Sequence, residues 1–179
     1  MTPRFEKAVE YVFEHEGGYN DIKGDKGGVT SYGISLRFLQ TLGIQGDIDG
    51  DGDVDWMDIK KLDKEHAESI YYNNFWKPFY DVIQEKIGIK VFDTAVNAGH
   101  GRAHKILQQS LKDLGSTKLL VDGLVGRTTL EECAKYKDLD ICKKYSFNQK
   151  AFYDSLVVKD PTQVKFIKGW TNRAMWLPN

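Results

Sequence analysis

Two neighbouring stretches carry the strongest signal in this chain: Glu16-Gly17-Gly18-Tyr19 and Asp25-Lys26-Gly27-Gly28-Val29-Thr30-Ser31-Tyr32-Gly33-Ile34. A carboxylate at the end of an apolar helix is followed by a glycine-punctuated turn with a second carboxylate. A short strand that begins with a hydroxyl comes next. Hydrolysis of a glycosidic bond needs a shielded acid, an ionised partner and a group that holds water. The two stretches supply residues of all three kinds.

Glu16 lies at the end of an amphipathic helix predicted over residues 3–16. The apolar residues before it recur at helical spacing, which places Glu16 on the apolar stripe of the helix: Phe5, Val9 and Val12. Partial burial and the negative end of the helix dipole both disfavour the ionised form of this carboxyl. A carboxylic acid that stays protonated near neutral pH can serve as a general acid.

The spacing of these groups resembles that of known lysozymes. Asp25 follows Glu16 by nine residues and Thr30 follows Asp25 by five, similar to the Glu, Asp, Thr arrangement of phage-type lysozymes with the second interval one residue shorter. The E-G-G-Y start and the D-x-G-G-x-T-x-Y-G-I continuation resemble more closely the N-acetylmuramidases of glycoside hydrolase family 108. Further matches follow in the same order: Ala67-Glu68-Ser69-Ile70-Tyr71, Phe75-Trp76, Asp93-Thr94-Ala95-Val96-Asn97-Ala98-Gly99, Leu107-Gln108, Asp122-Gly123-Leu124-Val125-Gly126, Gly169-Trp170 and Arg173.

The resemblance implies a mainly α-helical, lysozyme-like fold with a small β-hairpin region near the N-terminus. Residues 1–90 would form the catalytic part, and residues 91–179 a helical part similar to the family's peptidoglycan-binding region, packed with it into one globular unit. The implied reaction hydrolyses the β-1,4 bond between N-acetylmuramic acid and N-acetylglucosamine, with Glu16 as general acid. Asp25 would stay ionised and, with Thr30, position the attacking water. Inversion at the sugar carbon is expected, as in phage-type lysozymes.

Three residues are candidates for contacts with the sugar chain. The resemblance places Asn97 in a segment that lines the substrate groove, although a helix C-cap is an equal alternative for this residue. Tyr32 and Trp170 could stack on pyranose rings, or either could belong to the core. His100 could transfer a proton, but an ordinary loop histidine is the simpler reading.

The aspartate-rich segment 47–58 has the pattern of a calcium loop. Oxygen ligands stand at alternate positions, Gly52 allows the sharp turn, and Asp58 takes the twelfth position, where EF-hands have Glu and dockerin loops have Asp. We predict that Ca²⁺ is held by Asp47, Asp49, Asp51, the Asp53 carbonyl and Asp58. The ion would be a structural clip between the flanking helices, and no cofactor would be required for the chemistry. The alternative to calcium binding is a solvated acidic loop. The alternative to a structural clip is a regulatory or docking role for the ion.

Composition limits the other partners. The formal net charge is −1 and no basic stripe stands out, which argues against nucleic acid. No apolar run reaches membrane-spanning length, and Thr2 and Pro3 predict a helix start rather than a signal peptide. We therefore expect a monomeric phage or prophage endolysin, made in the bacterial host cytoplasm, that acts on peptidoglycan glycan strands after release. Cys133 and Cys142 are expected to be reduced thiols.

Apolar spacing and stop signals predict the remaining helices. They run over 36–42 before Gly43, from about 58 to 75 with a break near 63, over 91–96 before Gly99, over 103–114 with Gly115 as cap, and over 141–156. Thr128 and Glu131 form a plausible capping box for a further helix. Asp160-Pro161 opens the last helix, with Val164, Ile167 and Ala174 on one face.

A second class of function stays open at this point. The chain could be a non-catalytic, calcium-dependent module that binds the cell wall or a protein, as described for secretion-activator relatives. Such a module has no need for a shielded acid at Glu16, so a cell-wall turbidity assay separates the two classes.

Overall fold

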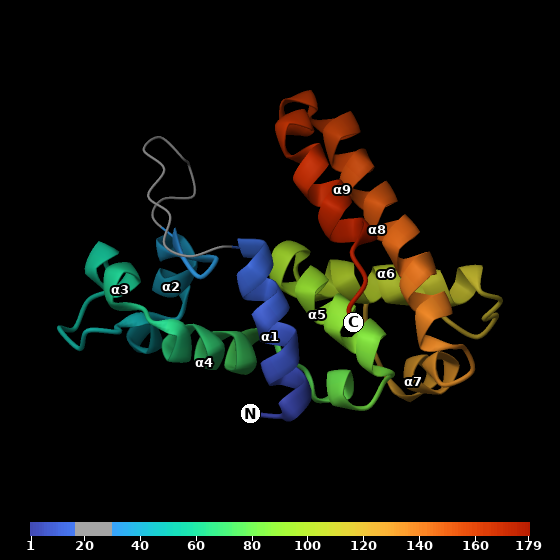
Figure 1. Cartoon of the computed structure of the whole chain (residues 1–179), viewed down its shortest axis with the longest axis horizontal. Coiled ribbons are helices and arrows are strands. Elements are labelled where there is room, and N and C mark those ends of the chain that lie inside the picture. Colours follow the sequence, from blue (N-terminus) through green and yellow to red (C-terminus); the bar gives the residue numbers. More distant parts are fainter. Residues whose placement is uncertain (17–29) are drawn as a thin grey trace. The chain divides into compact units, whose positions relative to one another are not determined.

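The computed structural model describes residues 1–16 and 30–179, except for the side chain of Glu16. The fold is mainly α-helical with one small antiparallel hairpin near the N-terminus, which confirms the predicted fold class (Figure 1). Internal contacts divide the chain into two compact units. The first contains Met1 and Glu6–Asn74, and the second contains Thr2–Phe5 and Phe75–Asn179. Each unit is described by itself.

The first unit is built from short elements around a small core. In chain order these elements are α1 (Pro3–Glu16), β1 (Thr30–Ser31), β2 (Ile34–Ser35), α2 (Leu36–Thr41), the 3₁₀ helix η1 (Gly43–Gly46), α3 (Trp56–Lys61) and α4 (Lys64–Phe75). α1 has the predicted bounds, and the hydroxyl of Thr2 accepts a hydrogen bond from the Phe5 amide at 3.2 Å, as expected of an N-cap. The predicted break near Asp63 separates α3 from α4.

The core of the first unit is aliphatic, with one tyrosine. Its buried side chains come from α1, β2, α2, α3 and α4 in turn: Val9, Val12, Ile34, Leu39, Ile59, Ala67 and Tyr71. Leu62, which directly follows α3, is also buried, and its carbonyl oxygen accepts a hydrogen bond from the Ser31 hydroxyl at 3.5 Å. Since Ser31 lies in β1, this contact joins the end of α3 to the hairpin.

The second unit is a helical assembly around α5. Its elements are η2 (Pro78–Asp81), α5 (Glu85–Ala98), α6 (His100–Asp113), α7 (Arg127–Cys133), α8 (Asp138–Lys159), η3 (Pro161–Phe166) and α9 (Ile167–Met175). α5 packs against α6 and α8, and α8 also packs against α9 (Figure 1). Every residue from Ile87 to Ala95 is buried, as expected of a helix covered on all sides.

Two charged residues of α5 are buried with partners. Asp93 accepts a bidentate pair of hydrogen bonds from Arg173 of α9, with Nε–Oδ2 at 2.9 Å and Nη2–Oδ1 at 2.8 Å. Lys90 donates from Nζ to the carbonyl oxygens of Ala174 and Trp176, at 2.8 and 2.6 Å. Burial lowers the pKa of Lys90 to about 8. These contacts tie α9 and the segment after it to α5.

Helix ends show where local patterns succeed and where they mislead. The end of α6 was predicted correctly: Gly115 has φ 113°, and the amides of Gly115 and Ser116 close a Schellman motif on the carbonyls of Lys112 and Leu111. The capping box predicted at Thr128 and Glu131 is wrong. α7 already begins at Arg127, so Thr128 lies within its first turn, and Glu131 instead pairs with Arg127 across one turn at 2.7 Å.

The last predicted helix is divided in two. The carboxylate of Asp160 caps the 3₁₀ helix η3 by accepting from the Thr162 amide at 3.0 Å, and the α-helix begins only at Ile167. Because a 3₁₀ helix turns every three residues, Val164 leaves the predicted face and is 58% exposed, whereas Ala174 is buried.

Both cysteines are free and buried, Cys133 in α7 and Cys142 in α8. Burial raises the pKa of each thiol to about 12. The expectation of two reduced thiols is confirmed.

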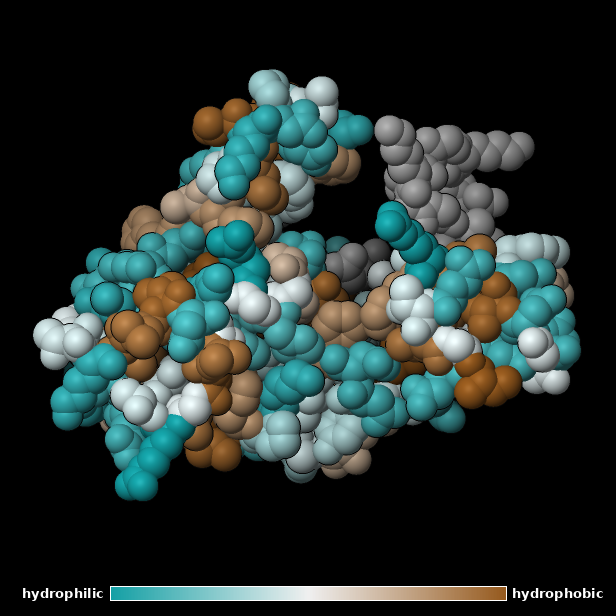
Figure 2. Space-filling view, turned by 180° about the vertical axis from the view of Figure 1, so that it is seen from behind, coloured by the Kyte–Doolittle hydropathy of each residue, from teal (hydrophilic) through white to brown (hydrophobic). Residues whose placement is uncertain are grey.

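The surface is mixed in character. Figure 2 shows separate hydrophobic areas among hydrophilic ones on the visible face. The most exposed apolar side chains include Ile44, Leu120, Leu124 and Val158. Within the part of the chain that the structure describes, no helix has the length and apolar character needed to cross a bilayer.

Candidate functional site

The predicted catalytic residues belong to the first unit. Glu16 is the last residue of α1, at the end of a stripe in which Val9 and Val12 are 1% and 0% exposed. The side chain of Glu16, and all of Asp25, lie outside the described residues. Thr30 opens β1, is half-buried, and is paired in register with Ser35 of β2. The hairpin therefore fixes the backbone at Thr30.

Tyr32 and Gly33 form the two-residue turn of this hairpin. Their φ angles are 50° and 77°, so both central residues have positive φ, as in the tight turns whose twist suits a β-hairpin. A tyrosine in this region is strained, and its neighbours hold it in place. Its carbonyl oxygen accepts from the Tyr71 hydroxyl at 2.8 Å, and its ring meets the edge of Phe13 at 5.3 Å. Tyr32 is half-buried, between the core and the solvent.

The second unit brings the other two predicted sugar-binding residues together. Trp170 stacks on Tyr153 with ring centroids 5.3 Å apart and planes at 18°, and the Tyr153 hydroxyl donates to Asn97 Oδ1 at 2.8 Å. Asn97 is exposed and Trp170 is half-buried. The alternative of a C-cap at Asn97 is wrong, because α5 continues past it to a C-cap at Gly99, where φ is 82°.

Tyr153, which joins this pair, was missed by sequence reasoning. The apolar stripe expected along residues 141–156 consists of Ile141, Tyr145, Phe152 and Leu156, whereas Tyr153 is the neighbour that is only 1% exposed. The adjacent aromatics Phe152 and Tyr153 were the available signal, since both faces of α8 need a partner when two aromatics follow each other.

Shallow grooves on the second unit include two that adjoin α6. One, of about 360 Å³, is lined by α6 and α8, and the guanidinium of Arg102 lies 4.6 Å from the centroid of the Phe152 ring there. The other, of about 210 Å³, adjoins the turn Asp122–Leu124. The side chain of buried Gln108 holds this turn: it donates to Asp122 Oδ1 and to the Leu124 carbonyl, and it accepts from the Gly123 amide, all at 2.8–3.0 Å.

Two histidines lie at the start of α6. His100 stacks on Phe75, and its Nε2 lies 2.9 Å from the Phe75 carbonyl, so this nitrogen must carry the proton. His104 is held between the Gly123 carbonyl at Nδ1 and the Tyr80 hydroxyl at Nε2, at 3.1 and 3.0 Å. Burial lowers the pKa of both rings, that of His104 to about 4. Both are therefore neutral near pH 7.

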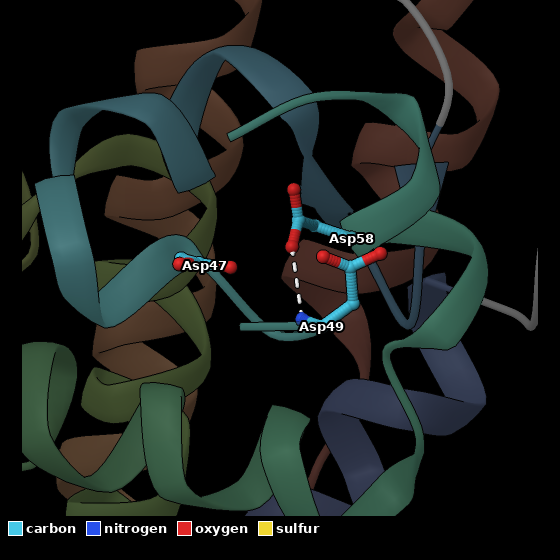
Figure 3. Close-up of side chains that lie close together, drawn as sticks. All are labelled: Asp47, Asp49 and Asp58. Carbon is cyan, nitrogen blue, oxygen red and sulfur yellow. Dashed lines mark hydrogen bonds between the residues drawn. The ribbon is translucent and has the colours of Figure 1, made fainter. Parts of the chain in front are cut away.

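The aspartate-rich loop connects η1 to α3. One carboxylate oxygen from each of Asp47, Asp49 and Asp58 lies within 4.8 Å of the others, and Figure 3 shows the three side chains. Carboxylate oxygens of Asp53, Asp55 and Asp58 form a second group of the same kind. Asp51 belongs to neither group. The structure thus places three of the five predicted ligands together.

Hydrogen bonds shape this loop from both ends. Asp47 accepts from the amides of Gly50, Asp51 and Gly52 at 2.7–3.2 Å. Asp58, which is 1% exposed, accepts from Ile48 and Asp49 at Oδ1 and from Asp55 at Oδ2. The first and last aspartates of the loop therefore each accept several hydrogen bonds from backbone amides.

The pKa values of the loop carboxylates follow from these contacts. Burial raises the pKa of Asp58, but the amide hydrogen bonds outweigh it and hold the pKa below its usual value. The negative charge of Asp51, followed by partial burial and the charge of Asp55, raises the pKa of exposed Asp53. The loop carboxylates therefore repel one another, even though the amides of Asp53 and Met57 donate to Asp51 and Asp55.

Comparisons with known proteins cover nearly the whole chain. Residues 9–99 match the family described as glycosyl hydrolase 108, and residues 102–175 match a family described as a predicted peptidoglycan domain. Among solved structures, the chain is similar to Brucella abortus SagA, with 31% sequence identity and a TM-score of 0.73, covering 95% of this chain and 88% of that one. No curated protein matches.

The first match spans all three predicted catalytic residues, and the second covers α6 to α9. The first match therefore indicates hydrolysis of a glycosidic bond, and the second indicates peptidoglycan as the substrate. Together they support a peptidoglycan hydrolase that is similar to lysozymes. This chain belongs to the glycosyl hydrolase 108 family and is a glycoside hydrolase of the N-acetylmuramidase type.

Proposed function

We propose that this enzyme hydrolyses the β-1,4 bond between N-acetylmuramic acid and N-acetylglucosamine, with Glu16 as the general acid. The observation that carries the proposal is the family match over residues 9–99, which contains Glu16, Asp25 and Thr30 at the spacing noted above. The buried stripe of α1 supports the proposal. A position at the end of that stripe and at the negative end of the helix dipole favours the protonated form of a carboxyl.

The other two groups then have complementary roles. Asp25 stays ionised, stabilises positive charge that develops on the sugar ring, and accepts a proton from the attacking water. Thr30, whose backbone the hairpin fixes, orients that water through its hydroxyl. Inversion follows if the two carboxyl groups stand about 6.5–9.5 Å apart, because this separation leaves room for water on the opposite face of the sugar.

The proposal predicts that Glu16→Gln keeps the fold and loses about 10²–10⁴-fold in the rate of glycan cleavage, because an amide cannot protonate the leaving oxygen. Glu14→Gln is the matched control, since Glu14 is exposed on the same helix and should retain full activity. Purified peptidoglycan is the substrate. Cleavage is followed by new reducing ends, and mass spectrometry identifies the sugar at each end.

The outcomes separate the alternatives. Reducing ends on N-acetylmuramic acid support the proposed bond, whereas reducing ends on N-acetylglucosamine would contradict it. If Glu16→Gln cleaved at the rate of Glu14→Gln, another residue would be the acid. No cleavage by the unmodified protein, with glycan binding retained, would favour a non-catalytic binding module.

The resemblance to phage-type lysozymes extends the proposal to the biological setting. The enzyme would be a phage or prophage endolysin that accumulates in the bacterial cytoplasm and reaches the wall only after release. Expression alone should then leave a culture turbid, and permeabilising the inner membrane should clear it rapidly. Permeabilised cells that contain Glu16→Gln should stay turbid.

A further inference from the structure

The aspartate-rich loop contains a buried carboxylate oxygen with no hydrogen-bond partner. The side chain of Asp49 is only 7% exposed, and its Oδ1 has neither a donor nor solvent within the described residues. Its other oxygen, Oδ2, lies 3.1 Å from Nζ of Lys61, whose side chain is 53% exposed. Lys61 thus contacts only one oxygen of the carboxylate, and leaving the other buried and unpartnered is costly, so the arrangement favours a further cation at Oδ1.

The neighbouring carboxylates surround the position where this cation would lie. Oxygens from Asp47, Asp49 and Asp58 lie within 4.8 Å of one another. Two oxygens bound to one Ca²⁺ at 2.3–2.6 Å lie up to about 5 Å apart, so the spacing of these oxygens is compatible with a shared ion. In Figure 3 the carboxylates of Asp49 and Asp58 lie close together.

We propose that this loop binds one Ca²⁺ through Asp47, Asp49 and Asp58, with Asp51 and the main-chain carbonyl of Asp53 completing the shell. All these ligands are hard oxygens, which favour calcium over zinc or copper. Positive φ at Gly50 and Gly52, 77° and 99°, lets the backbone curl around the ion, and the amide bonds to Asp47 hold this curl in advance. Mg²⁺ fits less well because it demands a tight octahedral shell.

The position of Asp58 indicates what the ion does. Asp58 is the third residue of α3, where it completes a capping box with Asp55. α3 buries Ile59, and the Leu62 carbonyl after it receives the Ser31 hydroxyl of β1. Calcium at Asp58 would therefore fix the start of α3 and, through α3, support the hairpin that carries Thr30.

The direct test uses Tb³⁺, which takes Ca²⁺ sites and emits when a nearby aromatic ring is excited. Trp56, the first residue of α3, lies within the 47–58 segment and should sensitise it. We expect Trp-excited Tb³⁺ emission that Ca²⁺ abolishes by competition and equimolar Mg²⁺ does not. Asp49→Asn should weaken the apparent affinity at least about tenfold, as should Asp51→Asn, while Asp140→Asn, at an exposed position of α8, should leave it unchanged.

Thermal unfolding provides the second readout. Chelation should lower the melting temperature of the unmodified protein, and Ca²⁺ should restore it, because a ligand that binds the native state stabilises it by mass action. Circular dichroism shows whether the variants fold, and the exposed Asp51 offers a substitution outside the core. No metal-dependent emission, together with an unchanged melting temperature in excess chelator, would overturn the proposal. Glu16→Gln should bind calcium normally, so failure of this site and failure of the catalytic assignment are distinguishable.

Discussion

Tyr32 holds a backbone conformation that residues other than glycine rarely adopt, with φ at 50°. It lies two residues after Thr30, within the stretch that matches the glycosyl hydrolase 108 family. The hydrogen bond from Tyr71 and the edge contact with Phe13 compensate the strain. At this scale the sequence predicted a short strand that begins at Thr30 and a small hairpin region near the N-terminus, but it did not locate the turn at Tyr32 and Gly33. The hydrogen bond from Tyr71 could not be foreseen, because it joins residues far apart in the chain.

Gly33 allows a prediction about this turn. Gly33→Ala places a Cβ at φ 77°, so we expect a loss of about 1–2 kcal/mol in the free energy of unfolding and slower glycan cleavage, since the turn positions Thr30. Gly169→Ala is the control: nothing lies within 4 Å of its added Cβ, and alanine favours a helix. Urea unfolding of the two variants should shift in opposite directions. If Gly33→Ala were as stable as the unmodified protein, the turn would accommodate the added Cβ without a loss in the free energy of unfolding.

Helices were predictable where one face is polar. The stripe of α1 and the glycine cap of α6 gave correct ends, because both signals are local. The start of α5 was placed several residues too late, since a helix buried from Ile87 to Ala95 has no polar face to mark its period. The pairing of Asn97 with Tyr153 depends on the packing of α5 against α8, which a local pattern does not encode.

The turn after α6 yields a prediction at the scale of an element. Gln108→Ala removes three hydrogen bonds to residues 122–124 and leaves the buried Gly123 amide without an acceptor. We expect a loss of about 1–3 kcal/mol in the free energy of unfolding and faster amide exchange in this turn. Gln109→Ala, next to it on the exposed face, removes one bond to Asp113 and should change stability by less than about 0.5 kcal/mol. Comparable losses in both variants would contradict the role of Gln108.

At the scale of the whole molecule, neutral buried histidines make stability depend on pH. The unfolded chain protonates His104 near pH 6.5, whereas burial lowers its pKa in the native state to about 4. Below pH 6.5 the unfolded state therefore binds the extra proton, and stability falls with decreasing pH until about pH 4. The slope from one such group is at most about 1.4 kcal/mol per pH unit.

This pH dependence can be measured by urea unfolding at pH 7 and pH 5. His104→Gln should flatten the change between the two pH values, even if it lowers stability at both, because glutamine does not titrate. An unchanged pH dependence in His104→Gln would show that other groups dominate it.

The two inert thiols have a practical consequence for chemical labelling. Cys133 and Cys142 are the only cysteines of the chain, and both are buried with pKa values raised to about 12. Since maleimides react with accessible thiolates, neither side chain should be modified under native conditions. A cysteine introduced at an exposed position, as in Lys159→Cys, would then be the single reactive thiol. Fluorophores or spin labels could thus be attached to the folded enzyme without first replacing the native cysteines.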